Sequence, residues 1–226
     1  MIEMNKVRVG VIGVGSWGQC HVEAYKACAN AEVVAICDRN EDRLRLAGEQ
    51  FGIEKRYTDA EAMMREDLDL VSIVTVEDDH FRPAVAALRS GKHVIVEKPV
   101  STRFEEARQM LEEANSAGRL IIPGHLLRFD PRYAQIYQSI QSGRIGQVGS
   151  MYLKRSRKKT WFQTYQRIHT VYELTIHDLD LAIWYAQSRV KRVRSHAQYL
   201  LQGKAPDLLW STLEFENGMI AFLQSN

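Results

Sequence analysis

The feature that most constrains the fold of this chain is a glycine pattern close to its N-terminus. An apolar run that begins at Val7 leads directly into Gly13-Val14-Gly15-Ser16-Trp17-Gly18, and a helix-like stretch follows. In such a turn the first glycine allows the tight bend, the second lets a pyrophosphate approach the backbone, and the third lets the helix pack closely on the strand. The sequence therefore predicts a dinucleotide site at the N–H groups of the helix start, formed by Gly13, Gly15, Ser16, Trp17 and Gly18.

An acidic residue supports this interpretation over an ordinary strand–turn–helix without a ligand. The next apolar run, Ala31–Cys37, ends in Asp38, the position at which a ribose-binding carboxylate belongs. A carboxylate there would accept hydrogen bonds from the ribose hydroxyls and repel a 2′-phosphate, which favours NAD. Arg39 could instead pair with that phosphate, so NADP stays an alternative.

Composition excludes several classes of protein. The chain has 226 residues, 45% of them hydrophobic and 26% charged, which is typical of a soluble globular protein with one large or two modest domains. A net charge of +2 gives no reason to expect nucleic acid or an anionic membrane as partner. No apolar stretch approaches the ~20 residues of a membrane span.

Cysteine and histidine usage narrows the expectations further. The three cysteines form no CxxC motif, and the N-terminus has no apolar signal core, so we expect reduced thiols and a cytoplasmic location. The histidines show no HxxxH or HExxH spacing, so we expect no metal site.

The first half of the chain alternates between strand-like and helix-like segments. This alternation is typical of a doubly wound parallel sheet, an α/β Rossmann fold. Ser101 or Thr102 is expected to cap the last of the helices. The predicted strands cover 33–37, 70–74, 93–96 and 120–122 after the first one, and the predicted helices cover 17–29, 41–51, a short segment ending at 64, 82–90 and 103–117.

The pattern changes near Gly124. Asp130-Pro131 predicts the start of a helix that continues to about residue 140, and Asn217-Gly218 is a strong hairpin signal. We therefore predict a dinucleotide-binding domain over 1–123 and an α+β domain over 124–226, with a mostly antiparallel sheet, for substrate binding and oligomerisation. Its predicted elements are strands at 148–157, 190–201, 208–215 and 219–224 and a helix at 172–186.

The helix predicted over 172–186 carries an unusual polar stripe. At 100° per residue, four polar or aromatic side chains fall on one face between two apolar flanks: Glu173, His177, Asp180 and Trp184. Such a stripe could line a cavity, but a solvent-exposed face with ion pairs between successive turns is about equally compatible with the pattern.

Two further segments carry charge. Lys98 follows the strand at 93–96, at the edge of a parallel sheet where ligands bind, and Pro99 biases it toward an extended conformation. It could act there as an acid or base, although most lysines are ordinary surface residues. The run 154–159 is either a solvated strand end, which we favour slightly, or a basic rim for an anionic substrate.

Four motifs in this order resemble the glucose–fructose oxidoreductase, inositol dehydrogenase and rhizopine-catabolism (Gfo/Idh/MocA) family. They are Gly13–Gly18, Glu97-Lys98-Pro99, the segment 124–131 and the segment 173–180. The resemblance extends over nearly the whole chain. It implies a Rossmann domain followed by a mostly antiparallel α/β domain, an NAD(P) cofactor, and hydride transfer to or from a sugar or polyol.

The resemblance also implies roles for individual residues. Lys98 and His177 would be catalytic and converge from the two domains, with Glu173 assisting. Glu97 and Lys98 would complete the cofactor site together with Asp38 and Arg39. The expected substrate contacts come from Lys98, Arg128, Asp180 and His177.

Two departures from the family pattern leave alternatives open. Glu173 stands where the family often has Asp, and members usually run about a hundred residues further, so this is either a short member or an incomplete sheet. A cofactor-binding sensor without turnover, or a reductase of a non-sugar carbonyl or imine, would share the same motifs.

The second domain contains more apolar residues than a single helix could cover. Exposed apolar surface of that extent normally marks an interface, so we expect a homo-oligomer formed through the C-terminal sheet. The residues concerned are Leu200, Leu208, Trp210, Leu213, Phe215, Ile220 and Phe222.

Overall fold

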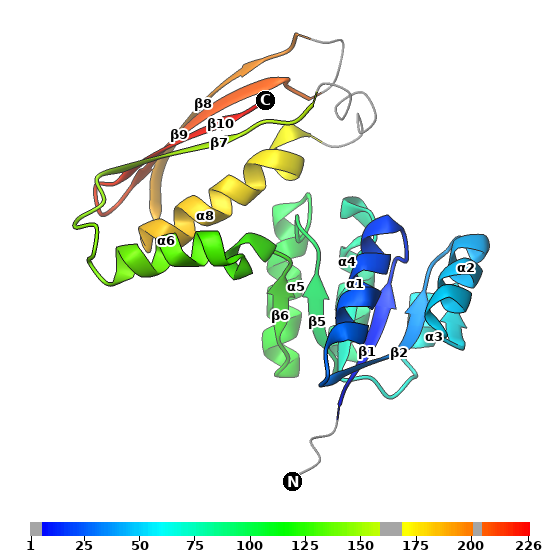
Figure 1. Cartoon of the computed structure of the whole chain (residues 1–226). Coiled ribbons are helices and arrows are strands. Elements are labelled where there is room, and N and C mark those ends of the chain that lie inside the picture. Colours follow the sequence, from blue (N-terminus) through cyan, green and yellow to red (C-terminus); the bar gives the residue numbers. More distant parts are fainter. Residues whose placement is uncertain (1–5, 159–168, 201–204) are drawn as a thin grey trace. The chain divides into compact units, whose positions relative to one another are not determined.

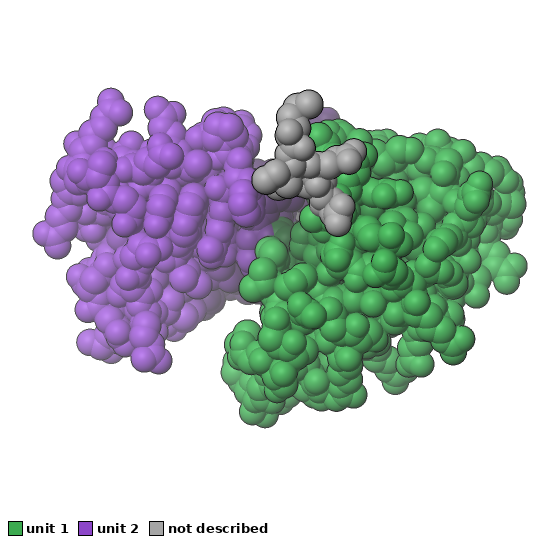
Figure 2. All heavy atoms as spheres, turned by 90° about the horizontal axis from the view of Figure 1, so that it is seen from below, with its two compact units in different colours: residues 1–124 green, residues 125–226 purple. Residues whose placement is uncertain are grey.

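The computed structural model describes residues 6–158, 169–200 and 205–226. The chain divides into two compact units, 1–124 and 125–226, which are coloured separately in Figure 2. The division falls one residue after the predicted boundary. Each unit has its own sheet, which is packed against hydrophobic clusters of the same unit.

Unit 1 contains a six-stranded sheet in which every neighbouring pair of strands is parallel. The strand order β3-β2-β1-β4-β5-β6 is that of a doubly wound Rossmann sheet, as the sequence predicts (Figure 1). The strands are β1 (Val7–Ile12), β2 (Ala31–Cys37), β3 (Lys55–Tyr57), β4 (Leu70–Ile73), β5 (His93–Val96) and β6 (Ile121–Pro123).

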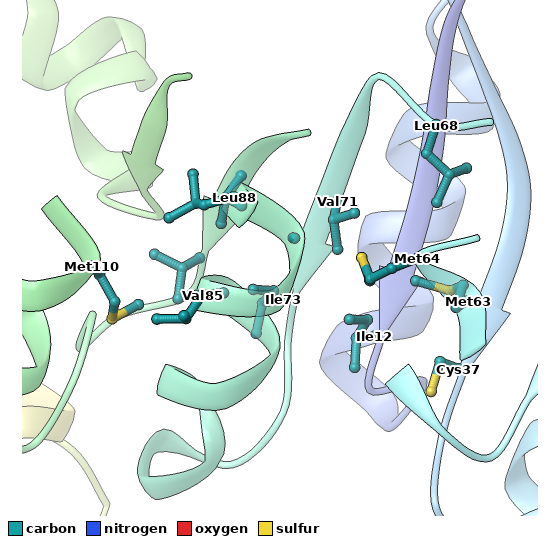
Figure 3. Packing of buried hydrophobic residues seen from close by; sticks show 14 of the residues in the cluster. Ile12, Cys37, Met63, Met64, Leu68, Val71, Ile73, Val85, Leu88 and Met110 are labelled. Atoms are coloured by element: carbon teal, nitrogen blue, oxygen red, sulfur yellow. The ribbon is translucent and has the colours of Figure 1, made fainter. Parts of the chain in front are cut away.

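Helices cover both faces of this sheet. One core joins alternate residues of β1, such as Val9 and Val11, to α1 and α2, and the other joins the opposite face to α3, α4 and α5 (Figure 3). Burial on both faces explains why the strands read as nearly continuous apolar runs. The helices are α1 (Ser16–Ala27), α2 (Glu41–Phe51), α3 (Ala60–Met63), α4 (Phe81–Arg89) and α5 (Phe104–Ala117), with a short 3₁₀ turn, η1 (Glu77–Asp79).

Two local features of unit 1 differ from the sequence prediction. Strand β3 was not predicted, because it is a three-residue edge strand with two charged residues and no apolar run. The predicted cap of α5 is wrong: Arg103 occupies the N-cap position without a side-chain cap, and the Thr102 hydroxyl instead donates to Asp78 at 2.6 Å.

Unit 2 contains a four-stranded sheet in the order β7-β10-β9-β8. Only the β7–β10 pair is parallel, so the prediction of a mostly antiparallel sheet is confirmed. Gly218 at the β9–β10 hairpin has φ +87°, the left-handed conformation for which Asn-Gly turns are selected. The strands are β7 (Ser150–Arg155), β8 (Val190–Gln198), β9 (Leu208–Phe215) and β10 (Ile220–Ser225); residue 201, the predicted end of β8, lies outside the described residues.

Helical segments pack on one face of this second sheet. Helix α8 (Ile176–Ala186) contributes Ala182 and Ala186 to a core that includes Leu213 and Leu223. A 3₁₀ turn, η2 (Leu126–Phe129), precedes α6 (Pro131–Gln141), and the Asp130 side chain caps α6 as predicted by accepting from the Arg132 amide. Figure 1 shows α8 along the sheet, and none of the described helices of unit 2 lies on the other face.

The helix predicted over 172–186 is not a continuous α-helix. Residues Val171–Thr175 form a π-helical turn, η3, and α-helical geometry begins only at Ile176. In a π turn each backbone hydrogen bond joins residues five apart in the sequence, rather than four apart as in an α-helix. The angle of 100° per residue, on which the predicted stripe is based, therefore does not apply to Glu173. Two apolar residues of α8, Leu181 and Tyr185, are buried, whereas a third, Ile183, is exposed.

Candidate cofactor and active site

The three glycines of the N-terminal turn have distinct steric reasons to be glycine. Gly13 has φ +88°, and a Cβ there would lie 2.6 Å from the carbonyl oxygen of Val74. A Cβ on Gly18 would lie 1.8 Å from the carbonyl oxygen of Gly13. Around Gly15, by contrast, no heavy atom beyond the adjoining residues of the chain lies within 4 Å of the Cβ position. The turn therefore combines two close backbone contacts with one open position suited to an approaching phosphate.

Helix α1 begins at this open position. Gly15 is its N-cap residue and makes no side-chain capping bond. The first amides of a helix lack partners within the helix, so the N–H groups of Ser16, Trp17 and Gly18 are oriented to bind an anion. All five residues predicted to contact the pyrophosphate are thus gathered at one helix start.

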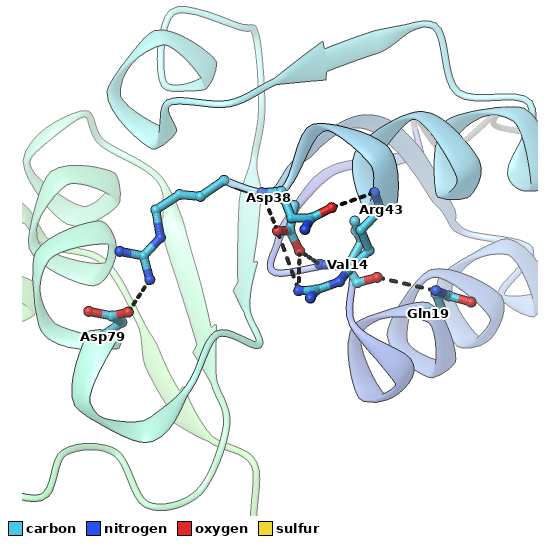
Figure 4. Close-up of polar contacts among 7 residues, drawn as sticks. Val14, Gln19, Asp38, Arg43 and Asp79 are labelled. Carbon is cyan, nitrogen blue, oxygen red and sulfur yellow. Dashed lines mark hydrogen bonds and ion pairs between the residues drawn. The ribbon is translucent and has the colours of Figure 1, made fainter.

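Asp38 lies beside the same turn, at the end of β2 (Figure 4). Its buried carboxylate accepts from the Val14 amide at 3.0 Å through Oδ2 and from the Asn40 amide at 2.9 Å through Oδ1. Arg43 Nη1 also donates to both carboxylate oxygens, at 3.5 Å and 3.2 Å, so a ribose hydroxyl would have to displace this contact. The side chain predicted to bind ribose therefore also fixes the glycine turn.

Two arginines next to Asp38 have different partners. Arg43, on the first turn of α2, places Nη1 3.2 Å from Asp38 Oδ2. Arg39, which was predicted to lie in the cofactor site, has an exposed side chain and forms an ion pair with Asp79. Arg43 is not among the predicted site residues, although the sequence places it in the first turn of a helix that Asn40 caps.

The Glu97-Lys98-Pro99 motif follows β5, at the same carboxyl edge of the sheet as the glycine turn and Asp38. The Glu97 side chain is buried and accepts hydrogen bonds from His21 Nε2 at 3.1 Å and from the Lys98 amide at 3.0 Å. Burial would raise the pKa of Glu97, but the hydrogen bonds from His21, the Trp17 indole and the Lys98 amide together lower it. Glu97 is therefore held as a carboxylate, and Lys98 beside it is half-buried.

A second histidine holds the other end of this motif. The buried ring of His80 places Nδ1 2.8 Å from the Pro99 carbonyl oxygen and Nε2 3.2 Å from that of Thr75. Lys98 is thus fixed in the chain between two residues, Glu97 and Pro99, that are each bound by a histidine. Neither His21 nor His80 was identified from the sequence.

In unit 2, Arg128 and Asp180, both predicted to contact substrate, contact each other. Arg128 donates to Asp180 through Nε at 2.9 Å and through Nη2 at 2.6 Å. The guanidinium also lies 5.8 Å from the ring centre of Trp184, which stacks on Tyr137 at 4.2 Å. Part of the predicted polar stripe is therefore an ordered cluster of ion pair and aromatic rings.

Two arginines of the basic run 154–159 form ion pairs within unit 2. Alternation along β7 directs Arg155 to the face covered by α8, where it donates to the buried Asp178 at 2.8 Å. Arg157 lies 3.2 Å from Glu173. The favoured prediction of a solvated segment is therefore wrong for Arg155 and Arg157, and Lys159 lies outside the described residues. Burial raises the pKa of Asp178, and its contact with Arg155 lowers it in part.

The structure distributes the predicted catalytic residues between the two units. Lys98 lies in unit 1, whereas Glu173 in η3 and the half-buried His177 in the first turn of α8 lie in unit 2. Within the described ranges, no three His, Cys, Asp or Glu side chains cluster so as to hold a metal ion. In the same ranges, no helix is long and apolar enough to cross a membrane.

Known relatives resemble the chain along nearly its whole length. It is 28% identical over 228 residues to a myo-inositol 2-dehydrogenase of Thermotoga maritima, a match covering 97% of this chain and 68% of that protein. It is 29% identical over 192 residues to an inositol 2-dehydrogenase of Salmonella typhimurium, covering 83% of this chain and 57% of the relative. The chain thus matches roughly three-fifths to two-thirds of these relatives' length.

A solved structure shows the same fold. An oxidoreductase from Agrobacterium radiobacter, crystallised with NAD⁺, L-tartaric acid and magnesium, superposes with a TM-score of 0.90 at 25% identity, covering 97% of this chain and 66% of that one. Two family models match as well: an oxidoreductase-family NAD-binding Rossmann model over residues 7–125 and a GFO/IDH/MocA C-terminal domain model over 133–226. The chain therefore belongs to the GFO/IDH/MocA oxidoreductase family, with an NAD-binding Rossmann domain followed by the family's C-terminal domain.

Proposed function

We propose that this protein is an NAD-linked dehydrogenase or reductase acting on a hydroxyl group, or the corresponding carbonyl, of a polyol or sugar. The observation that carries the proposal is the arrangement along one edge of the parallel sheet in unit 1. There the open glycine turn, the buried Asp38 and the fixed Lys98 follow β1, β2 and β5, respectively. Ligands of doubly wound sheets bind at this carboxyl edge.

The residues present fit a dinucleotide. The start of α1, with open space at Gly15, suits a pyrophosphate, and Asp38 could accept from a ribose hydroxyl in place of its contact with Arg43. When bound, NAD supplies the acceptor or donor of a hydride. The ion pair of Arg39 with Asp79 supports NAD over NADP, whereas Arg43 next to Asp38 keeps NADP binding chemically feasible.

The roles proposed for the protein's own groups concern the hydroxyl proton. The Lys98 ammonium would hydrogen-bond the reacting oxygen, and His177 would exchange the proton of that hydroxyl. Glu173 would orient His177 or adjust its basicity. Support comes from the motifs in which these residues lie and from the rigid attachment of the Lys98 backbone.

The substrate class is inferred from relatives and from the Arg128–Asp180 cluster. Matched relatives are named as dehydrogenases of inositols. Arg128 uses two of its five N–H donors on Asp180, and its side chain is 39% exposed, so donors are left for substrate hydroxyls. A compound with several hydroxyl groups suits this arrangement.

We also propose that the protein is a homo-oligomer through the open face of the sheet in unit 2. Leu213 and Phe215, expected to be part of the interface, are instead buried beneath α8. Side chains that alternate with the buried ones remain exposed, among them Tyr152, Trp210 and Phe222. Exposed aromatic residues on a sheet face are typical of an interface between subunits.

A reducing cellular compartment is consistent with the cysteines. All three are free thiols, and Cys20 and Cys28 are exposed. Exposed free thiols persist where glutathione and thioredoxin keep proteins reduced. We therefore propose a cytoplasmic location.

A fluorescence screen tests the proposed function. The full chain is incubated with NAD⁺ or NADP⁺ and myo-inositol, scyllo-inositol, aldoses, uronic acids or nucleotide sugars, and the appearance of reduced nicotinamide is followed. Turnover of one polyol class that disappears in Lys98→Ala supports the proposal. Tight NADH binding without turnover of any hydroxyl compound would favour a sensor, and reduction of only non-sugar carbonyls or imines would favour the other alternative.

A further inference from the structure

A chain of hydrogen bonds crosses unit 1 beneath the proposed cofactor site. His21, on α1, places Nε2 3.1 Å from Glu97 Oε1 and Nδ1 3.0 Å from the hydroxyl of Ser72 on β4. Ser72 is fully buried and is also hydrogen-bonded to Tyr25. This series of hydrogen bonds therefore connects α1 and β4 to the residue that precedes Lys98.

The partners define the orientation of the His21 ring. A carboxylate only accepts hydrogen bonds, so Nε2 carries a proton and donates it to Glu97. The Ser72 hydroxyl can both donate and accept, so it satisfies Nδ1 whichever role that nitrogen takes. Two contacts, one from β4 and one from the residue that follows β5, thus hold the ring in one position.

Glu97 passes this constraint to the backbone of Lys98. Its Oε2 accepts from the Lys98 amide at 3.0 Å, while Oε1 accepts from His21. The carboxylate also packs tightly on Gly124, where an added Cβ would lie 2.9 Å from Oε1. Any rotation of Glu97 would therefore break the bond to His21 or to Lys98.

We propose that His21 is a positioning residue: through Glu97 it ties the phosphate-binding helix α1 to the Lys98 backbone and fixes Lys98 relative to the bound dinucleotide. This inference rests on the proposed function and extends it to a side chain outside the residues proposed to bind cofactor or substrate. Of the two ring nitrogens of His21, only Nε2 reaches Glu97, where it acts beside the Trp17 indole of the same helix. A substitution that keeps a donor at Nε2 retains the His21 part of this link, whereas one that keeps only the Ser72 contact loses that part.

Two substitutions separate the two ring contacts. In His21→Gln the amide group lies near the position of Nε2, and in His21→Asn it lies near Nδ1. Cys20→Ala, at an exposed position on the same helix, is the matched control. Dissociation constants are measured for NADH by fluorescence and for ADP-ribose, which lacks the nicotinamide, by calorimetry. Hydrogen exchange of the peptide containing Lys98 is measured by mass spectrometry without any ligand.

We expect His21→Asn to weaken NADH binding about tenfold and to speed exchange at the Lys98 amide by a similar factor, with ADP-ribose binding changed less than about twofold. His21→Gln is expected to restore most of both losses, and Cys20→Ala to change neither. An equal loss of NADH and ADP-ribose affinity would show that His21 merely supports α1. Equal behaviour of the Gln and Asn variants, or no change in either, would also overturn the inference.

A failure of the proposed function can be distinguished from a failure of the inference about His21. If the wild-type chain binds no NADH or oxidises no hydroxyl compound, the assignment as a dehydrogenase fails. The exchange rate of the Lys98 amide still decides whether His21 ties α1 to this turn, because that measurement needs neither cofactor nor substrate.

Discussion

Asp38 accepts a hydrogen bond from the backbone amide of Val14 at 3.0 Å, which links the end of β2 to the glycine turn after β1. One carboxylate thereby fixes the loop expected to bind the pyrophosphate and lies where the ribose is expected. Arg43 adds a positive charge at 3.2 Å from the same carboxylate oxygen. Cofactor preference should therefore depend on the balance between these two side chains.

The first prediction concerns that balance. Asp38→Asn keeps an acceptor for the Val14 amide but removes the negative charge that would repel a 2′-phosphate. We expect the ratio of NADP⁺ to NAD⁺ affinity to rise about tenfold, since the unpaired Arg43 could then bind the phosphate. Dissociation constants for both cofactors check this. Asp42→Asn, on the exposed side of α2, is the control, and an unchanged ratio in Asp38→Asn would contradict the prediction.

Most of the fold could be predicted from the sequence because local patterns specify it. The parallel strands are buried on both faces and read as apolar runs, and Asp130-Pro131 and Asn217-Gly218 mark a helix start and a hairpin through local chemistry. Strand β3 has no such local pattern. Its formation depends on pairing with β2 rather than on its own charged residues.

The candidate site could be predicted only in part. The glycine turn and Asp38 belong to one contiguous motif, so their proximity followed from spacing. The contacts of His21 with Ser72 and Glu97 join residues 51 and 76 positions apart, and no local pattern indicates them. The π turn before α8 was not predicted either, because the residues of a π turn follow no sequence pattern that distinguishes them from an α-helix.

The proposed catalytic pair gives the second prediction. Lys98→Ala and His177→Ala should each lower kcat by roughly 10²–10⁴-fold, as expected for groups that hydrogen-bond or exchange the reacting proton. The dissociation constant for NADH should change little. Lys191→Ala, at an exposed position on β8, is the matched lysine control. Wild-type kcat in both catalytic-site variants on an identified substrate would remove these residues from the mechanism.

Glu173 provides the third prediction. The carboxylate lies 3.2 Å from Arg157 and is placed by the π turn just before His177. Because it is proposed to assist rather than to transfer the proton, Glu173→Gln should reduce kcat by about tenfold, less than His177→Ala. The exposed Glu216→Gln should have no effect. Steady-state kinetics test the order of these losses, and a larger loss in Glu173→Gln would assign Glu173 a direct role.

The fourth prediction is a pH dependence of stability. Burial raises the pKa of Glu97, but its hydrogen bonds lower the pKa by more than burial raises it. The pKa of Glu97 in the folded protein therefore lies below the ordinary value. A carboxylate with a lowered pKa in the folded state contributes stability above its unfolded-state pKa, and this is lost as the pH falls through the folded-state value. Glu97→Gln should therefore melt at a lower temperature than wild type at pH 7. The difference should shrink as the pH falls below the ordinary value of 4.5. Thermal melts of both proteins and of Glu23→Gln measure it, and a difference that grows in acid would contradict the assignment.

The final prediction concerns assembly through the sheet of unit 2. Tyr152 and Trp210 are exposed by 55% and 43%, and their rings lie 6.4 Å apart on the face opposite α8. If this face joins two copies, light scattering at micromolar concentration should show a dimer or larger species. Trp210→Glu combined with Phe222→Glu should shift it to monomer, because charges would be buried without partners. The melting temperature of unit 1 should not change.

Leu111→Glu, at an exposed apolar position on α5, controls for the loss of surface hydrophobicity. A wild-type monomer, or an oligomer that persists in the double variant, would exclude this face as the interface.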